Sequence, residues 1–305
     1  MSSPVVFVCG ATGTQGGALT HHLLANNIEV HAITRNPLSP PAQKLQSRGV
    51  LLSEGDFDDE ESLRHAMANC TTLFLNLIPT FSSLGHELEQ AKRIIRIAKE
   101  TGIKHLIYTG ALGTTNPEKL RHWNPASPVA MLLLGKQAIE NEVRYAGFDQ
   151  WTILRPGNFM SNFLDPLVRM YQGLVETGTF TTAFTAETML PMVDPNDIGR
   201  FAAAAVLDPS KFHQEEIEIA SELMGAAELM QTLSQATGKH FQAAFLTDEE
   251  IQKQSAQNLY LSAQLAMRDM AQFVDINRVK SWNIELGTFA QFLEREKERV
   301  QDTFL

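Results

Sequence analysis

The chain has 305 residues, of which 44% are hydrophobic and 20% charged, so it is long and apolar enough to bury a large core. Its formal net charge of -10 opposes a broad surface for nucleic acid or an anionic membrane, because neutralising phosphates requires clustered Lys and Arg. The two cysteines, Cys9 and Cys70, provide neither a disulfide framework nor metal-ligand spacing, and both are expected to be small core residues. We therefore expect a cytoplasmic globular protein with no metal site, no membrane association and no direct contact with nucleic acid.

The first half of the sequence alternates strand and helix patterns joined by short connections. This alternation predicts an α/β fold, a doubly wound parallel sheet of the Rossmann type with helices on both faces. The expected strands are residues 5–9, 29–34, 50–52, 72–77, 105–109 and 151–154, and the expected helices are 14–26, 42–48, one that ends near 68, 84–101 and 129–145.

The second half mixes strands and helices less regularly. Here the patterns predict helices at 159–171, 196–206, 226–236, 259–273 and 288–300, a helix that begins at the capping box 247–250, and strands at 189–193, 215–220 and 241–245. We expect a nucleotide-binding core over 1–156 and a smaller mixed α/β region over 157–305 that covers the substrate. Residues 189–207 are expected to return to the core.

A segment without periodicity, residues 113–128, follows the fifth strand and is rich in Asn, Pro, Thr, His and Trp. A loop of about fifteen residues at the C-terminal end of a parallel strand is long for a connector. It is interpreted either as an active-site lid or as a surface insertion.

A glycine-spaced turn, Gly10-Ala11-Thr12-Gly13-Thr14-Gln15-Gly16-Gly17, links the first strand to the first helix. Such a turn lets backbone amides at a helix N-terminus face a pyrophosphate without interference from Cβ atoms. Arg35 follows the second strand, where a site selective for NAD usually has a carboxylate, and a guanidinium there suits a 2′-phosphate. The turn and Arg35 together predict NADP as the cofactor, unless Arg35 is only a solvated loop residue.

Motifs along most of the chain resemble those of the NmrA-like branch of the atypical short-chain dehydrogenases, which includes relatives similar to isoflavone reductase. The motifs are the turn Gly10–Gly16 and the segments 34–37, 55–57, 135–136, 154–160, 193–199 and 285–293. The resemblance implies that Asp56 and Phe57 lie beside the adenine and that the segment Asn76 to Ile78, with Asn76 and Leu77 as contacts, passes under the cofactor. Pro156 and Asn158 are also expected to contact the cofactor. Asp56 also fits a helix N-cap, and both interpretations stay open.

The catalytic pattern of ordinary short-chain dehydrogenases is incomplete in this sequence. Those enzymes place a Tyr four residues before a Lys, because the Lys lowers the phenol pKa and the phenol then exchanges a proton with the substrate. Here Lys136 is present, but Leu132 stands at the Tyr position and cannot donate a proton. Lys136 therefore either anchors the ribose and handles the proton itself, or is a solvated helix lysine.

This departure leaves two functions open. A third possibility is a purely structural protein that binds no nucleotide. The first is an NADP-dependent oxidoreductase that reduces an enone, carbonyl or imine of a small molecule, for instance in secondary metabolism. The second is a non-catalytic NADP(H) sensor that binds a regulatory protein such as a transcription factor, for which a nuclear location is also open. The sequence favours the oxidoreductase, because hydride transfer needs only a cofactor, a positioned substrate and a proton source.

Candidate substrate contacts lie after the fifth and sixth strands. Pockets are mostly apolar with a few polar anchors, although apolar residues in these segments also suit a core. The candidates are His122, Trp123, Met131, Phe159, Met160 and Phe163.

Overall fold

The computed structural model describes residues 3–79, 85–254 and 258–305, which divide into two compact units. The first unit consists of residues 1–114, 132–155 and 198–217, and the second of residues 115–131, 156–197 and 218–305. The units differ from the expected boundaries in two places. The loop after the fifth strand belongs to the second unit, and the segment that returns to the first unit is 198–217 instead of 189–207.

The first unit is built on a seven-stranded sheet with the order β10-β6-β5-β4-β1-β2-β3, and β1 to β6 pair in parallel. This confirms the predicted Rossmann-type fold, whose strand order reverses between β1 and β4. Its strands are β1 Val5–Val8, β2 Glu29–Thr34, β3 Leu51–Glu54, β4 Thr72–Leu75, β5 His105–Thr109, β6 Gln150–Pro156 and β10 Glu215–Ile219. Its helices are α1 Thr14–Ala25, α2 Pro40–Ser47, α3 Glu60–Ala66, α4 His86–Glu100, α5 Pro128–Tyr145 and α7 Pro195–Leu207. The start predicted for the fourth helix, residue 84, lies outside the described residues.

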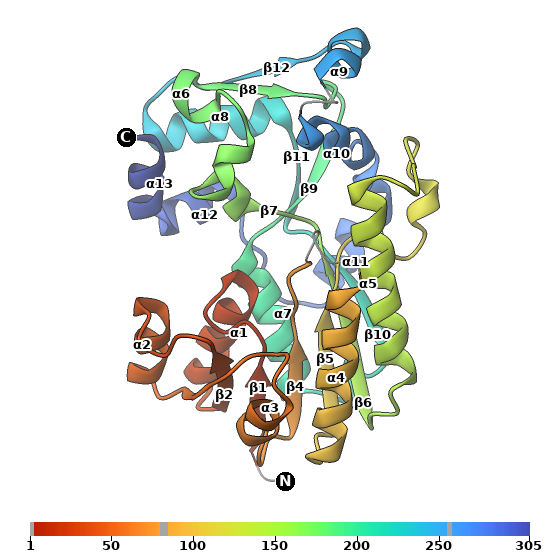
Figure 1. Cartoon of the computed structure of the whole chain (residues 1–305). Coiled ribbons are helices and arrows are strands. Elements are labelled where there is room, and N and C mark those ends of the chain that lie inside the picture. The colour runs from red at the N-terminus through yellow and green to blue at the C-terminus, as the bar shows by residue number, and fades with distance from the viewer. Residues whose placement is uncertain (1–2, 80–84, 255–257) are drawn as a thin grey trace. The chain divides into compact units, whose positions relative to one another are not determined.

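Helices cover both faces of this sheet (Figure 1). Apolar side chains of α3, α4 and α5 pack on one face and form a core that includes the predicted core residues Cys9 and Cys70. On α7, a Cβ at Gly199 would lie 2.7 Å from the carbonyl carbon of Ala18 on α1. The backbones of these two helices therefore touch at a point where only glycine fits.

His105, the first residue of β5, is buried, and its Nε2 has no hydrogen-bond partner among the described residues. Burial, with the charge of nearby His213, lowers the pKa of His105 to about 4. Between this value and the unfolded pKa near 6.5, the unfolded chain binds a proton that the folded chain does not. We therefore expect the free energy of unfolding to fall by about 3 kcal/mol as the pH drops from 6.5 to 4.

Urea unfolding across this pH range measures the effect, and His105→Gln should flatten the slope. An unchanged slope in the variant would show that other groups cause the loss.

The second unit contains two smaller sheets, β11-β9-β7 and β12-β8, with short helices and turns around an aromatic core. Its strands are β7 Asn158–Phe159, β8 Thr179–Thr182, β9 Met189–Val193, β11 Glu222–Gly225 and β12 Gln242–Phe245. Its helices are α6 Leu174–Thr177, α8 Ala226–Thr237, α9 Asp248–Gln254, α10 Leu259–Met267, α11 Ile276–Ser281, α12 Phe289–Arg295 and α13 Lys297–Phe304, and its 3-10 turns are η1 Pro117–Lys119, η2 Met160–Phe163, η3 Leu167–Met170 and η4 Met270–Phe273.

Several predicted elements of the second unit are wrong in extent. The helix expected at 159–171 is instead β7 followed by the turns η2 and η3, because Pro166 lacks the N–H that a continuous helix needs there. The helices expected at 259–273 and 288–300 each divide into two elements. The sequence patterns also missed α6, β8, β11 and α11, all of which are six residues or shorter.

Two acidic residues join distant parts of the second unit. The buried Asp194 accepts two hydrogen bonds of 2.8 Å from Arg295, and Asp197 accepts one from Ser221 and one from the backbone N–H of Gly287. Segments 193–199 and 285–293, which carry two of the family motifs, are thus held together. In the residues that the structure describes, no helix has the length and apolarity needed to cross a membrane.

Candidate functional site

The turn between β1 and α1 has the form that an anion-binding turn requires. Gly10 has a φ of +67°, and the backbone N–H of Gly13 donates to its carbonyl at 2.9 Å. A Cβ at Gly16 would lie only 2.3 Å from the Gly10 carbonyl oxygen. No side chain caps the N-terminus of α1, and Thr12, Gly13 and Thr14 are exposed. The turn thus presents free backbone N–H groups at a helix N-terminus.

A polar bridge connects this turn to the ends of β4 and β5. The Gln15 amide donates to Asn76 at 3.2 Å and accepts a hydrogen bond of 2.6 Å from the Thr109 hydroxyl. Asn76 also lies against Gly10, where an added Cβ would be 3.2 Å from its side-chain nitrogen. The predicted residues Gln15 and Asn76 therefore meet at the point where the strand order reverses, which is where α/β sheets bind ligands.

Arg35 and Asp56 lie together at the ends of the adjacent strands β2 and β3. The Arg35 side chain is 85% exposed, and its Nε is 3.8 Å from an Asp56 oxygen. Asp56 does not cap α3, because the N-cap is Asp59, which accepts from the backbone N–H of Glu61. Asp56 accepts instead from the backbone N–H of Asp58. The N-cap interpretation of Asp56 is thus wrong.

Two other residues expected near the cofactor, Phe57 and Leu77, pack in or against the core of the first unit. Phe57 packs against the core beneath α3 and α4, and its carbonyl accepts from Arg93. Leu77 is buried, whereas Ile78 beside it is 84% exposed. The side chain that the chain presents to solvent after β4 is therefore that of Ile78.

Lys136 is buried in the first unit and is no solvated helix lysine. Its ammonium donates to the Leu77 carbonyl at 2.9 Å and to the Glu87 carboxylate at 2.5 Å. Glu87, the second residue of α4, is itself buried, so the pair is largely shielded from water. Sequence reasoning missed Glu87, because only folding brings α4 against α5.

A second buried ionic network lies between α5, β6 and β10, and sequence reasoning missed it too. The Glu140 carboxylate accepts hydrogen bonds from Arg155, Arg144 and the Thr114 hydroxyl. Glu216 accepts from both arginines. Burial alone would lower the pKa of Arg155, but the two carboxylates reverse this and raise it. The network fixes the chain at Thr114, where the first unit leads into the loop after β5.

The remaining candidate residues lie in the second unit. Met160 and Phe163 have no exposed surface and belong to the aromatic core, so the core interpretation holds for both. The other side chains are at least partly exposed: Asn158, Phe159 and Trp123 are half-buried, and His122 and Met131 are exposed. Pro156 is buried at the end of β6. Over residues 3–79, 85–254 and 258–305, no three His, Cys, Asp or Glu side chains gather as a set of metal ligands.

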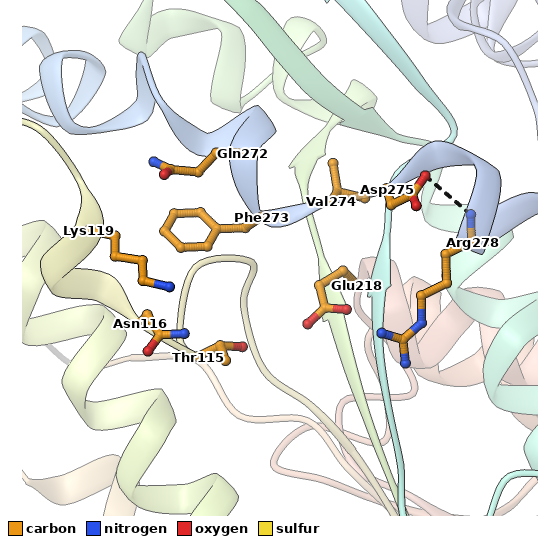
Figure 2. A pocket seen from close by; sticks show the side chains of 9 residues that line it. All are labelled: Thr115, Asn116, Lys119, Glu218, Gln272, Phe273, Val274, Asp275 and Arg278. Carbon is orange, nitrogen blue, oxygen red and sulfur yellow. Dashed lines mark hydrogen bonds between the residues drawn. The ribbon is translucent and has the colours of Figure 1, made fainter.

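The second unit also contains a polar pocket of about 390 Å³, which we call the Phe273 pocket (Figure 2). It takes residues from the loop after β5, from the end of β10, whose residues 218–219 belong to the second unit, and from the segment η4–α11. It is lined by Thr115, Asn116, Lys119, Glu218, Gln272, Phe273, Val274, Asp275 and Arg278. The expected substrate residues are not in this lining, although His122 and Trp123 belong to the same loop.

A model of the NmrA-like family matches residues 2–293. The chain belongs to the NmrA-like family. Relatives include the NmrA-like family domain-containing oxidoreductase ptmS of Penicillium ochrochloron, which is 28% identical over 77% of this chain and 73% of its own length. This membership confirms the resemblance found in the sequence motifs.

Solved structures of NmrA-like and related proteins share the fold of this chain. The triphenylmethane reductase of Citrobacter sp., complexed with NADP(H), is 21% identical with a TM-score of 0.73 over 95% of this chain and 99% of its own. The negative transcriptional regulator NmrA, in complex with NADP, is 18% identical with a TM-score of 0.74 over 99% and 98% of the two chains. An enzyme and a regulator thus share this fold, so the fold does not decide between the two functions.

Proposed function

We propose that this NmrA-like protein is an NADP-dependent oxidoreductase that reduces an enone, carbonyl or imine of a small organic molecule. The observation that carries the proposal is the uncapped turn before α1, with glycines at 10, 13 and 16, together with the exposed Arg35 guanidinium at the end of β2. The names of its curated relatives, several of which are NmrA-like oxidoreductases, favour an enzyme over a regulator.

The residues of the first unit fit NADP(H). The turn offers backbone N–H groups for the pyrophosphate, and the absence of a side chain at Gly16 lets the start of α1 pack against the Gly10 and Cys9 carbonyls, which holds these N–H groups in place. The Arg35 guanidinium has donors for a 2′-phosphate, and Gln15 and Asn76 provide amides where the strand order reverses. NADPH, when bound, supplies the hydride for the reduction.

Lys136 supplies the proton in this proposal. An ammonium group has three N–H donors, and among the described residues only Leu77 and Glu87 accept from it, which accounts for two of them. The third is left to donate to a ribose hydroxyl or to the substrate oxygen that becomes negative during reduction. The Glu87 carboxylate balances the charge of the ammonium in this shielded position and fixes the direction of the remaining N–H.

Replacing Arg35 by Ala tests the cofactor preference. We expect the dissociation constant for NADPH to rise about tenfold, because charge-assisted hydrogen bonds to the 2′-phosphate are lost, while that for NADH stays unchanged. Fluorescence titration measures both constants. Arg48→Ala, at an exposed arginine after α2, should leave both unchanged. A preference for NADH in the unmodified protein would contradict the assignment.

Replacing Lys136 by Met tests the chemistry. We expect turnover of enones and aldehydes with NADPH to fall by about 10²- to 10⁴-fold, because their reduction needs a proton donor. A preformed cyclic iminium needs no proton, so its reduction should largely persist and serve as an internal control. NADPH oxidation followed at 340 nm, with thermal unfolding to verify folding, gives the result. An equal loss on both substrate classes would show that Lys136 acts only in binding.

The two alternatives predict different results for the unmodified protein. A sensor binds NADPH tightly, turns over no substrate of the panel, and captures a protein partner that changes between NADP and NADPH. A chain that binds no nucleotide shows no rise in melting temperature with NADPH. Binding should raise the free energy of unfolding by about 2.7 kcal/mol at a hundredfold excess over the dissociation constant.

A further inference from the structure

The Phe273 pocket is lined by side chains of opposite charge and by an aromatic ring. Lys119 ends η1, Glu218 belongs to β10, and Phe273 ends η4. Figure 2 shows the Lys119 ammonium and the Glu218 carboxylate pointing toward the middle of the pocket from opposite sides, with the Phe273 ring above the Lys119 ammonium in this view. Its volume of about 390 Å³ falls within the range of small-molecule sites, which runs from about 300 to 1,000 Å³.

Charged side chains of this pocket are able to form ion pairs or hydrogen bonds with a ligand. The Lys119 side chain is exposed, and within the described residues its ammonium makes no ion pair or hydrogen bond. A carboxylate has about four acceptor positions, so Glu218 can accept from a ligand in addition to its interactions within the protein. The amides of Asn116 and Gln272 add donors and acceptors along the rim.

A neighbouring pocket of about 480 Å³ shares Lys119 and Gln272, and its charged residues Arg121, Arg268 and Asp269 already have contacts within the protein. Arg268 donates to the Ala183 carbonyl at 2.6 Å, and Asp269 accepts from the backbone N–H of Arg121 and lies 3.8 Å from its guanidinium. A ligand there would have to compete with these contacts. The Phe273 pocket is therefore the better site for a charged ligand.

We propose that the Phe273 pocket binds a small amphoteric aromatic molecule, with its anionic group at Lys119, its amine at Glu218 and its ring against Phe273. Each of the three groups matches one feature of the lining, and a molecule with only one charge makes only one of the two charged contacts. The proposal concerns binding alone and does not rest on the proposed reduction.

Three probes that share one phenyl ring separate the contributions of the two charges. L-phenylalanine carries both charges, phenethylamine only the positive one, and 3-phenylpropionate only the negative one. In NMR titrations of the full chain without NADPH, we expect phenylalanine to bind about tenfold tighter than either single-charge probe, because each charged contact adds one charge-assisted hydrogen bond.

Variants should change these affinities selectively. Lys119→Met should weaken phenylalanine and 3-phenylpropionate about tenfold and leave phenethylamine unchanged, and Glu218→Gln should weaken the two amines and spare 3-phenylpropionate. Phe273→Leu should weaken all three probes alike. Lys280→Met, at an exposed lysine of α11 outside the pocket lining, is the matched control and should change none of them.

Three results would overturn the proposal. They are the absence of saturable phenylalanine binding at millimolar concentration, equal affinity for the three probes, and a Lys119→Met variant that loses phenethylamine as strongly as 3-phenylpropionate. Because Lys119 is exposed, this variant stays informative even if Glu218→Gln affects folding. NADPH is absent throughout, so failure here is distinct from failure of the oxidoreductase proposal.

Discussion

Glu140→Gln is expected to lower the free energy of unfolding by about 3–5 kcal/mol, because it leaves the buried Arg155 guanidinium without its main counter-charge. Glu140 is fully buried and accepts from Arg155 at 2.9 and 2.7 Å, from Arg144 at 2.9 Å and from Thr114 at 2.6 Å. Glu216 remains as a partner of both arginines, but it is partly exposed and cannot replace the bidentate contact. Urea unfolding monitored by circular dichroism measures the loss.

Glu142→Gln on the same helix is the matched control. Glu142 is partly exposed and lies outside the network of Glu140, so its replacement should change stability by no more than about 0.5 kcal/mol. If Glu140→Gln lowers the free energy of unfolding by less than about 1 kcal/mol, Glu216 alone is sufficient to balance the charge of Arg155, which contradicts this expectation.

Gly16→Ala is expected to weaken NADPH binding by about a hundredfold or more. The new Cβ would lie 2.3 Å from the Gly10 carbonyl oxygen and 2.8 Å from that of Cys9, so the turn has to move. Both obstacles are backbone atoms, which cannot swing aside as a side chain does. Losing two hydrogen bonds to the pyrophosphate costs about 3 kcal/mol, which corresponds to this change in affinity. Isothermal titration calorimetry measures it.

Gly135→Ala separates this effect from a general intolerance of alanine. Gly135 lies in α5, and a Cβ there meets no atom within 4 Å. We expect the variant to bind NADPH normally and to gain about 0.5–1 kcal/mol of stability from its higher helix propensity. Normal NADPH affinity in Gly16→Ala would place the cofactor elsewhere on the chain.

Sequence reasoning was most accurate where short-range chemistry decides the structure. Strands at 29–34, 105–109 and 189–193 agree with β2, β5 and β9 to the residue, because their apolar patterns end at clear turns. It failed over 159–171, where an apolar pattern resembles a helix but Pro166 prevents one. Phe163 is likewise predicted to contact the substrate but lies in the core, because an apolar residue after a strand suits a pocket and a core equally well.

The sequence by itself determined the Rossmann-type α/β fold, the family and the glycine turn, since strand and helix periods, turn glycines and motif spacing are properties of neighbouring residues. Only the tertiary structure decided what the important side chains contact. Lys136 meets Glu87 from 49 positions away, Asp194 meets Arg295 from 101, and the Phe273 pocket gathers residues 115–119, 218 and 272–278. Such pairings depend on how whole elements pack, and no local pattern encodes which buried charge will meet which.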